Sequence, residues 1–151
     1  MSEYNIELRK VNDNDLILLY WWANDKTVRT NAFNKDLISP EQHKEWFDRK
    51  IRDLDIKMYI LFVNNMPVGQ IRLEKENGHY VIDYSIECNS RGRGFGKTLL
   101  KLVESKVPAG TVLVGYVKPE NHFSRKAFEA NLYEIKYTVL KGTIKYEKTV
   151  G

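Results

Sequence analysis

Short stretches of strand-like and helix-like hydrophobic spacing follow one another along the chain. Residues 4–11 alternate apolar and polar side chains, which predicts a strand. The polar run 12–15 then offers an N-cap and an acidic first turn to the apolar run 16–22, which predicts a helix. We expect the Trp21-Trp22 pair at the end of this helix to lie in the core. The stretch from there to residue 38 shows no clear spacing, and its structure stays open.

The middle of the chain predicts one helix and three strands. Ser39-Pro40-Glu41-Gln42 places Ser at an N-cap, Pro at the first helical position and Gln three residues after the Ser. This capping box predicts a helix through about Arg52. Three apolar-rich stretches follow, separated by the turn pairs Asn64-Asn65 and Asn77-Gly78. The predicted antiparallel strands are residues 56–63, 68–76 and 80–87.

The last third predicts a crossover from a strand through a helix to another strand. A glycine-rich loop over residues 91–96 follows the third antiparallel strand, and apolar residues at helical spacing run from Thr98 to Val107. The elements expected after them are a strand over 111–117, a helix over 121–131, and a strand from Tyr133 to Val139 that turns at Lys141-Gly142 into a last strand.

These elements predict an α/β protein of the α+β type, with about seven strands in a mixed, mainly antiparallel sheet and about four helices. Because hairpin-joined strands come before the crossover, we expect the ligand site near the switch from antiparallel to parallel pairing. A length of 151 residues, with no internal repeat or linker, predicts a single domain over residues 1–151. The composition is 42% hydrophobic and 29% charged, which excludes disorder for most of the chain.

The net charge of +4 lies in one short segment. Residues 91–106 hold five basic residues and one acidic residue, and the rest of the chain is neutral. A compact basic segment suits one small anion better than a nucleic acid, which needs a stripe of phosphate contacts. The apolar runs are too short to span a bilayer, and no signal core is visible at the start. We therefore expect a cytoplasmic protein that binds neither nucleic acid nor membrane.

Cysteine and histidine usage argues against disulfides and metal. The single cysteine, Cys88, has no internal partner, and the three histidines show no ligand spacing. We interpret Cys88 as a small residue that ends a strand. A covalent acetyl-enzyme on this thiol is disfavoured because no histidine lies nearby in sequence.

The segment from Arg91 to Thr98 carries the clearest chemical signal. Its three glycines allow unusual backbone angles, and the helix that follows presents free N–H groups and a positive dipole end to a phosphate. The spacing is not the G-x-G-x-x-G of a dinucleotide site, and a P-loop would need Gly where Arg91 stands. A merely tight turn would explain one glycine, but not three glycines together with two arginines.

Two spaced motifs instead resemble one family. Arg91-x-x-Gly94-x-Gly96 resembles the acetyl-CoA pyrophosphate loop of the GNAT-type N-acetyltransferases, and Asn121-x-x-Ser124-x-x-x-Phe128 resembles their Asn-centred helix beside the pantetheine arm. This resemblance implies the GNAT fold and acetyl-CoA as acetyl donor. The residues it implies for cofactor binding are Ile86, Glu87, Arg91, Gly92, Arg93, Gly94, Phe95, Gly96, Lys97, Asn121, Ser124 and Phe128.

Within this superfamily the chain is similar to enzymes that acetylate the 4-amino group of a UDP-linked deoxy amino sugar in bacterial surface-glycan biosynthesis, on the route to pseudaminic-acid-type sugars. The segments that carry the likeness are Trp21 to Asp25, Val28-Arg29, Asn31, Phe33, Ile38 to His43, Gly69 to Arg72 and Val117 to Asn121. The likeness implies Arg29, His43, Arg72 and Tyr84 on the sugar-nucleotide side. Arginine suits a diphosphate, and Tyr or His suits uracil and sugar hydroxyls.

The chemistry of amide formation needs a neutral amine, a polarised carbonyl and protonation of the thiolate. The resemblance implies that the backbone of Tyr84 to Cys88 pairs with pantetheine and polarises the thioester, and Glu87 is our candidate for the base, directly or through water. Many family members have a Tyr acid where this chain has Phe128. Ser124, Tyr116, Tyr133 or a water could replace it, or the thiolate could leave unassisted.

Two other functions stay open at this point. A protein N-terminal acetyltransferase of ribosomal-protein type begins with a comparable helix pair, and a non-catalytic CoA-binding module would explain the missing acid at Phe128. The oligomeric state, a homodimer included, is not set by the sequence.

Overall fold

The computed structural model describes residues 4–136 and 142–151. In these residues seven strands and five α-helices alternate with three short 3₁₀ turns. The strands are β1 (Ile6–Lys10), β2 (Ile56–Val63), β3 (Met66–Glu76), β4 (His79–Ile86), β5 (Val112–Val117), β6 (Glu134–Lys136) and β7 (Ile144–Thr149). The helices are α1 (Leu16–Ala23), α2 (Lys26–Asn31), α3 (Pro40–Arg52), α4 (Phe95–Val103) and α5 (His122–Ala130).

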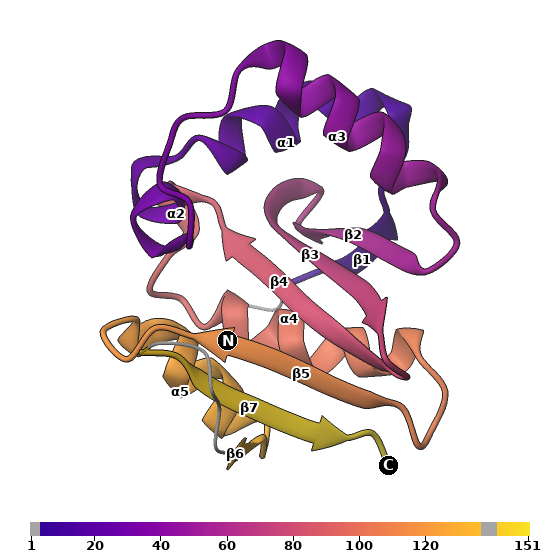
Figure 1. Ribbon diagram of the computed structural model, residues 1–151, viewed down its shortest axis with the longest axis vertical. Helices are drawn as coiled ribbons and strands as arrows, with labels where there is room; N and C mark the ends of the chain where they lie inside the picture. Colours follow the sequence, from indigo (N-terminus) through magenta and orange to yellow (C-terminus); the bar gives the residue numbers. More distant parts are fainter. Residues whose placement is uncertain (1–3, 137–141) are drawn as a thin grey trace.

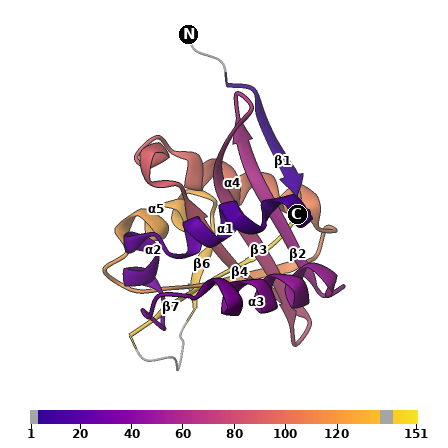
Figure 2. The same ribbon diagram turned by 90° about the horizontal axis from the view of Figure 1, so that it is seen from above.

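All seven strands form one sheet in the order β1-β2-β3-β4-β5-β7-β6. Every neighbouring pair is antiparallel except β4 and β5, which are parallel. The predicted mixed, mainly antiparallel sheet is thus confirmed. Figure 1 shows the sheet with α1 and α3 over one face and α4 behind the other, and the view from above in Figure 2 also separates α3 from α4.

Alternation along the strands fills a core on each face of the sheet. On β2, Met58 and Ile60 pack with Leu19 of α1 and Phe47 of α3, whereas Leu61 belongs to the larger core under α4 and α5. Leu99 and Leu100 of α4 and Phe128 of α5 are fully buried in that larger core. The two layers of helices therefore fix both faces of the sheet.

The local signals read from the sequence form as expected. Ser39 accepts a hydrogen bond from the Gln42 N–H, and the Gln42 side chain accepts one from the Ser39 N–H, so the capping box opens α3. Asn64 and Asn65 both have positive φ, as do Asn77 and Gly78, which is the geometry of tight hairpin turns with right-handed twist.

Three details differ from the predictions. The helix α4 begins at Phe95, not Thr98, and ends at Val103 before a 3₁₀ turn, because Gly96 and Lys97 already have helical geometry. The stretch whose structure stayed open contains α2, so five helices are seen instead of about four. Trp21 is 67% exposed, and only its neighbour Trp22 packs against the core.

The end of the chain is described in part. The strand predicted from Tyr133 to Val139 is seen as β6, while Tyr137, Val139 and Lys141 lie outside the described residues. Within residues 4–136 and 142–151, no helix combines the length and apolar character needed to cross a membrane.

A glycine in the middle of β5 lets α5 approach the sheet closely. A Cβ atom on Gly115 would lie 2.3 Å from Cζ of Phe128, so the ring occupies the space of a side chain at this position. The same ring stacks on Tyr146 of β7, with ring centroids 5.3 Å apart. This contact holds α5 directly under β5.

Candidate active site

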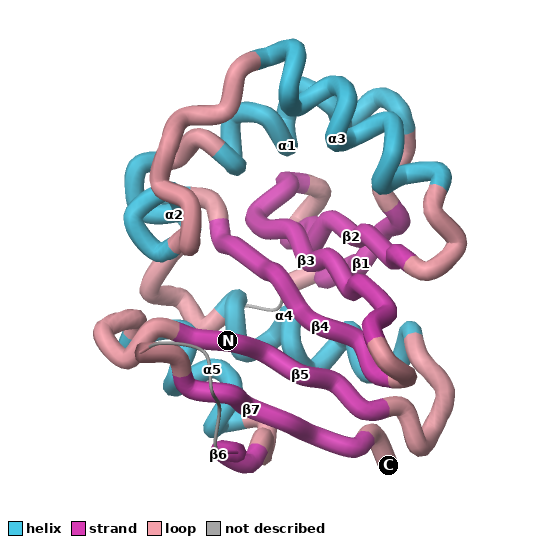
Figure 3. Tube along the Cα trace, viewed as in Figure 1, coloured by secondary structure: helices cyan, strands magenta, loops and turns pink. Residues whose placement is uncertain are grey.

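The parallel strands β4 and β5 separate halfway along their length. Tyr80, Val81 and Ile82 pair with residues 113–115, but beyond Ile82 no pairing joins the two strands. Both strands continue past this point, and Figure 3 shows the end of β4 running toward α2 while the end of β5 lies apart from it. The sheet therefore opens at the predicted switch from antiparallel to parallel pairing.

The open edge of β4 presents backbone donors to this gap. The Glu87 N–H donates to the carbonyl of Val68 on the neighbouring strand β3, at 2.8 Å. Because the direction of these groups alternates along a strand, the N–H groups of Tyr84 and Ile86 point the other way, toward the gap. The Ile86 carbonyl confirms this direction, because it accepts a hydrogen bond from Arg91 Nε at 2.9 Å.

A cleft of about 1120 Å³ runs through the gap. Helices α4 and α5 line one part of it, and α1, α2 and α3 line the other. The cleft thus joins the glycine loop to the helices at the start of the chain. Its volume is that of a site for a substantial small molecule.

The glycine loop has the geometry of an anion site. Gly92 and Gly94 have φ of 78° and 81°, which favours glycine, and α4 begins directly after Gly94. In the described part of the chain, no hydrogen bond engages the N–H groups of Gly96 and Lys97 in the first turn of α4. These residues fit a phosphate group, which such free N–H groups bind.

The side chains of this loop divide into two groups. Arg93 and Lys97 are exposed and form no ion pair with other described residues, so they are free to add charge to a bound phosphate. Phe95 is only 5% exposed and packs its ring edge-on against Tyr4. Of Phe95, only the backbone is placed to meet a ligand.

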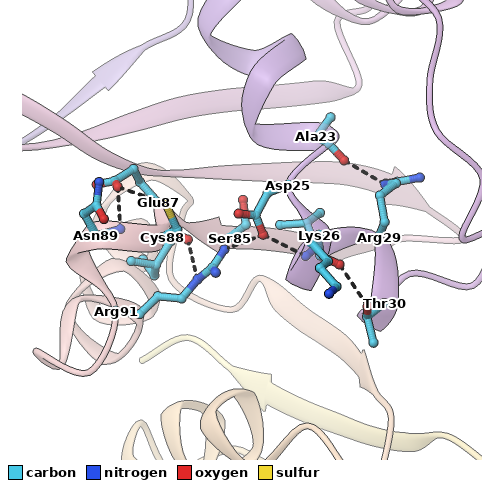
Figure 4. A network of polar contacts seen from close by, with 12 residues as sticks. Ala23, Asp25, Lys26, Arg29, Thr30, Ser85, Glu87, Cys88, Asn89 and Arg91 are labelled. Atoms are coloured by element: carbon cyan, nitrogen blue, oxygen red, sulfur yellow. Dashed lines mark hydrogen bonds and ion pairs between the residues drawn. The ribbon is translucent and has the colours of Figure 1, made fainter.

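Arg91 joins the loop to the start of α2, as Figure 4 shows. Its Nε donates to the Ile86 carbonyl, and its Nη2 lies 2.9 Å from Oδ2 of Asp25. Asp25 also caps α2 by accepting from the Val28 N–H. Burial alone would raise the pKa of Asp25, but the hydrogen bonds from Arg91 and Val28 hold it below its ordinary value. The geometry thus gives Arg91 a bracing role, and the phosphate contact expected for its side chain stays a prediction.

The Asp25–Arg91 pair is expected to stabilise the fold at neutral pH and not in acid. A carboxylate with a lowered folded pKa stabilises fully above its ordinary value of 3.8, and this stabilisation is lost as the pH falls through the folded pKa. Asp25→Asn keeps a capping residue and removes the charge, so it should cost roughly 0.5–1 kcal/mol at pH 7. Unfolding should be followed from pH 7 into the acid range, where the gap between the variant and the wild type should narrow as the pH falls below 3.8, with Asp13→Asn as the control. A gap that keeps its full size as the pH falls would contradict this assignment.

Glu87 lies beside the gap but its carboxylate is directed away from it. The carboxylate accepts hydrogen bonds from the Asn89 N–H and, at 2.8 Å, from the Ser90 hydroxyl, and so caps the 3₁₀ turn Cys88–Ser90. Burial opposes ionisation, yet these hydrogen bonds hold the pKa of Glu87 below its ordinary value. The base role stays a prediction, and these contacts argue against it. Cys88 is exposed, forms no disulfide within the described residues, and its thiol donates to the Glu87 carboxylate.

Two hydroxyls meet where α5 approaches β4. The Tyr84 hydroxyl donates to Ser124 Oγ at 3.1 Å, and the Asn121 side chain accepts from the Ser124 N–H and caps α5. Phe128 is 2% exposed and is enclosed by aromatic rings, so it supports the site from the core. Burial raises the pKa of Tyr84 to about 12, although the contact with Ser124 lowers it.

The two other tyrosines predicted as alternative acids lie in different surroundings. Tyr116 lines the cleft from β5. Tyr133 is buried, and its hydroxyl has no hydrogen-bond partner among the described residues. It does not line the cleft.

The residues predicted for the acceptor all line the cleft, and several of their polar atoms are already engaged within the protein. His43 is 3% exposed, with Nε2 lying 2.9 Å from the Leu16 carbonyl, and burial lowers its pKa. Arg29 donates to backbone carbonyls, among them that of Ala23 at 2.7 Å. Arg72 pairs with Glu74 and lies over the ring of Trp46. These bonds hold Arg29 Nε and Nη1 and His43 Nε2 in place, and the acceptor roles of His43 and Arg29 stay predictions.

Several cleft residues were not singled out from the sequence. Gln42, Trp46 and Arg49 line the cleft from one face of α3, and their helical spacing is a signal that could have found them. Lys118 lines it after the end of β5 and donates to the Ala32 carbonyl at 2.8 Å. No local signal pairs Asp25 with Arg91, because 66 residues separate them.

Comparison with known proteins agrees with this geometry. The family model described as "Acetyltransferase (GNAT) domain" matches residues 5–131. A search of curated proteins finds no match. Among solved structures, spermidine N-acetyltransferase from Vibrio cholerae, in complex with CoA and spermine, has a TM-score of 0.86 at 14% identity, over 96% of this chain and 95% of that one.

Two further structures share the fold. An aminoglycoside acetyltransferase in complex with coenzyme A has a TM-score of 0.80 at 20% identity, over 96% of this chain and 95% of that chain. A ribosomal alpha-N-protein acetyltransferase in complex with coenzyme A has a TM-score of 0.77 at 17% identity, over 96% and 94%. The family match covers most of the chain, and strands β1 to β5, the gap and the glycine loop lie within it. The chain therefore belongs to the GNAT acetyltransferase family and is an acetyl-CoA-dependent N-acetyltransferase.

Proposed function

We propose that the enzyme acetylates an amino group on an anionic small molecule, and that this acceptor is a UDP-linked 4-amino deoxy sugar. The sequence resemblance supplies the identity of the sugar nucleotide. The charge of the cleft supplies independent support, because its acceptor part holds three basic residues outside any described ion pair and one such carboxylate, that of Glu45 on α3.

The excess of positive charge comes from three residues. Arg29 and Lys118 donate to carbonyls, which satisfies their N–H groups but leaves their charge in place. Arg49 is exposed, and in residues 4–136 and 142–151 none of the three forms an ion pair. By contrast, Arg72 is paired with Glu74 and lies 3.6 Å from Asp83. A diphosphate would be attracted to this part of the cleft.

The same charge argues against a polycationic acceptor. The similar structures named above include an enzyme bound to spermine and an aminoglycoside acetyltransferase, and both acceptor types carry several amines. A positive cleft disfavours such molecules in the same way as it favours an anion. A peptide N-terminus without an acidic segment would gain nothing from this charge.

We propose that acetyl-CoA, the acetyl donor, lies with its pyrophosphate at the start of α4 and its thioester in the gap. The N–H groups of Gly96 and Lys97 bind the phosphates, with Arg93 adding charge. The N–H groups of Tyr84 and Ile86 are placed to polarise a carbonyl oxygen in the gap. Among the carboxylates of this region, Asp83 lines the cleft and Glu87 does not, so Asp83 is the better placed to take the amine proton.

The test is the initial rate of thiol release with three acceptors: a UDP-linked 4-amino deoxy sugar, spermidine and an N-terminal peptide. We expect release with the sugar nucleotide, and a rate at low acceptor concentration that falls as salt is added. Faster release with spermidine, or a rate that rises with salt, would contradict the proposal.

Arg49 gives the charge argument a site-specific test. Arg49→Glu should raise KM for the sugar nucleotide by about five- to tenfold and leave acetyl-CoA affinity unchanged, because it reverses a charge only in the acceptor part of the cleft. Lys44→Glu is the matched control, since Lys44 lies on the same helix and does not line the cleft. Equal effects of the two variants would show that the charge of Arg49 does not contact the acceptor.

A further inference from the structure

The hydroxyls of Tyr84 and Ser124 lie under the point where β4 and β5 separate. Tyr84 projects from β4 toward α4 and α5: a Cβ on Gly96 of α4 would lie 3.3 Å from its ring, and its ring centroid lies 5.9 Å from that of Phe128. Phe128 in turn packs on Gly115 of β5. Tyr84 therefore spans from one side of the gap to the other, with its hydroxyl at Ser124.

This hydroxyl pair has one hydrogen to spare. Tyr84 donates to Ser124 Oγ, and Ser124 Oγ donates to no acceptor in the described residues. Two hydroxyls carry two hydrogens, and only one is used between them. The unused hydrogen is that of Ser124. When the Ser124 hydroxyl turns to donate to Tyr84 Oη, the Tyr84 hydrogen becomes available to a group bound in the cleft, which both residues line.

A sulfur that leaves into this half-buried cleft needs a proton, because an uncompensated thiolate is costly away from water. Phe128 has no proton to give, and the capped carboxylate of Glu87 does not line the cleft. A phenol is a stronger acid than an aliphatic alcohol. Of the hydroxyl pair, Tyr84 is thus the better source of the proton.

We infer that Tyr84 is the proton donor to the leaving sulfur and that Ser124 positions its hydroxyl. As the C–N bond forms and the C–S bond breaks, the sulfur takes the proton of Tyr84 Oη. The Ser124 hydroxyl then donates to the tyrosinate oxygen. The proton lost by the acceptor nitrogen restores Tyr84 through water, so no proton is gained or lost overall. The inference rests on the proposed binding of the thioester in the gap, but not on the identity of the acceptor.

The decisive test compares the binding of CoA with that of desulfo-CoA, which lacks the sulfur. Isothermal titration of the wild type should show CoA bound about five- to tenfold more tightly, the effect of one hydrogen bond to sulfur. Tyr84→Phe should abolish this preference and leave desulfo-CoA affinity unchanged. Tyr116→Phe is the matched control, because it removes the same group from the other side of the cleft and should keep the preference.

A second measurement tests the inference without an activity assay and with two variants instead of one. The thiol pKa of bound CoA, followed by thiolate absorbance, should be lower in the wild type than in Tyr84→Phe, with Ser124→Ala between them. A preference for CoA that survives in Tyr84→Phe, or an unchanged thiol pKa in both variants, would overturn the inference. If acetyl transfer to the sugar nucleotide failed while these binding results held, only the proposed acceptor would be wrong.

Discussion

Replacing Gly94 by valine is expected to weaken acetyl-CoA binding by at least about a hundredfold, the loss of one or two charge-assisted hydrogen bonds. Gly94 has φ of 81° and immediately precedes α4. Valine is strongly disfavoured at this angle, so the loop would shift and the free N–H groups at the start of α4 would no longer converge on one phosphate. Isothermal titration with acetyl-CoA measures the change directly.

Gly110→Val is the matched control for this loss. Gly110 also has a positive φ, 90°, with open space around it, but it lies in the turn before β5 and does not line the cleft. Both variants should lose similar stability from backbone strain, whereas only Gly94→Val should lose affinity. Unchanged affinity in Gly94→Val would remove the glycine loop from the phosphate site.

The largest expected effect on stability is that of Gly115→Ala. The added methyl would lie 2.3 Å from the Phe128 ring, and this ring is held by its stack on Tyr146. Overpacking of this kind costs about 3 kcal/mol, or roughly 6–12 °C in melting temperature for a domain of this size. Thermal unfolding followed by circular dichroism gives the value.

A double-mutant cycle distinguishes the steric overlap with Phe128 from any other effect of Gly115→Ala on the stability of β5. Phe128→Leu should be destabilising alone, but the double variant Gly115→Ala/Phe128→Leu should lose less than the sum of the two, because the smaller side chain makes room for the methyl. Strict additivity would show that the ring and the strand do not compete for the same space.

Most of the fold prediction depended on signals that act between residues close together in sequence. The capping box at Ser39, the positive-φ turns at Asn64-Asn65 and Asn77-Gly78, and the glycine loop all act over a few residues, and each forms as the sequence indicates. Helix α2 could not be predicted in this way. It has six residues, and its cap Asp25 is paired with Arg91, a tertiary contact that local spacing does not reveal.

The sequence predicted which backbone segments form the site better than it predicted which side chains contact a ligand. The loop and the edge of β4 depend on glycine spacing and strand alternation, which a sequence shows directly. Arg29, His43 and Arg72 have the right chemistry for an acceptor, yet in the fold some of their polar atoms already bond to a carbonyl or a carboxylate. Residue type indicates what a side chain can bind, but only the packing decides whether its polar atoms are free. Gly96 illustrates the same point: its spacing indicates a loop, but it lies within α4, where a Cβ would come 3.3 Å from the Tyr84 ring.

The most direct test of the proposed reaction is to find where the acetyl group goes. Acetyl-CoA with a labelled acetyl group should be incubated with an equimolar mixture of a UDP-linked 4-amino deoxy sugar, spermidine and an N-terminal peptide, and the products separated by mass spectrometry. The proposed function predicts the label on the 4-amino nitrogen of the sugar, with an equal amount of free CoA. Label on spermidine or on the peptide, with none on the sugar nucleotide, would contradict the account.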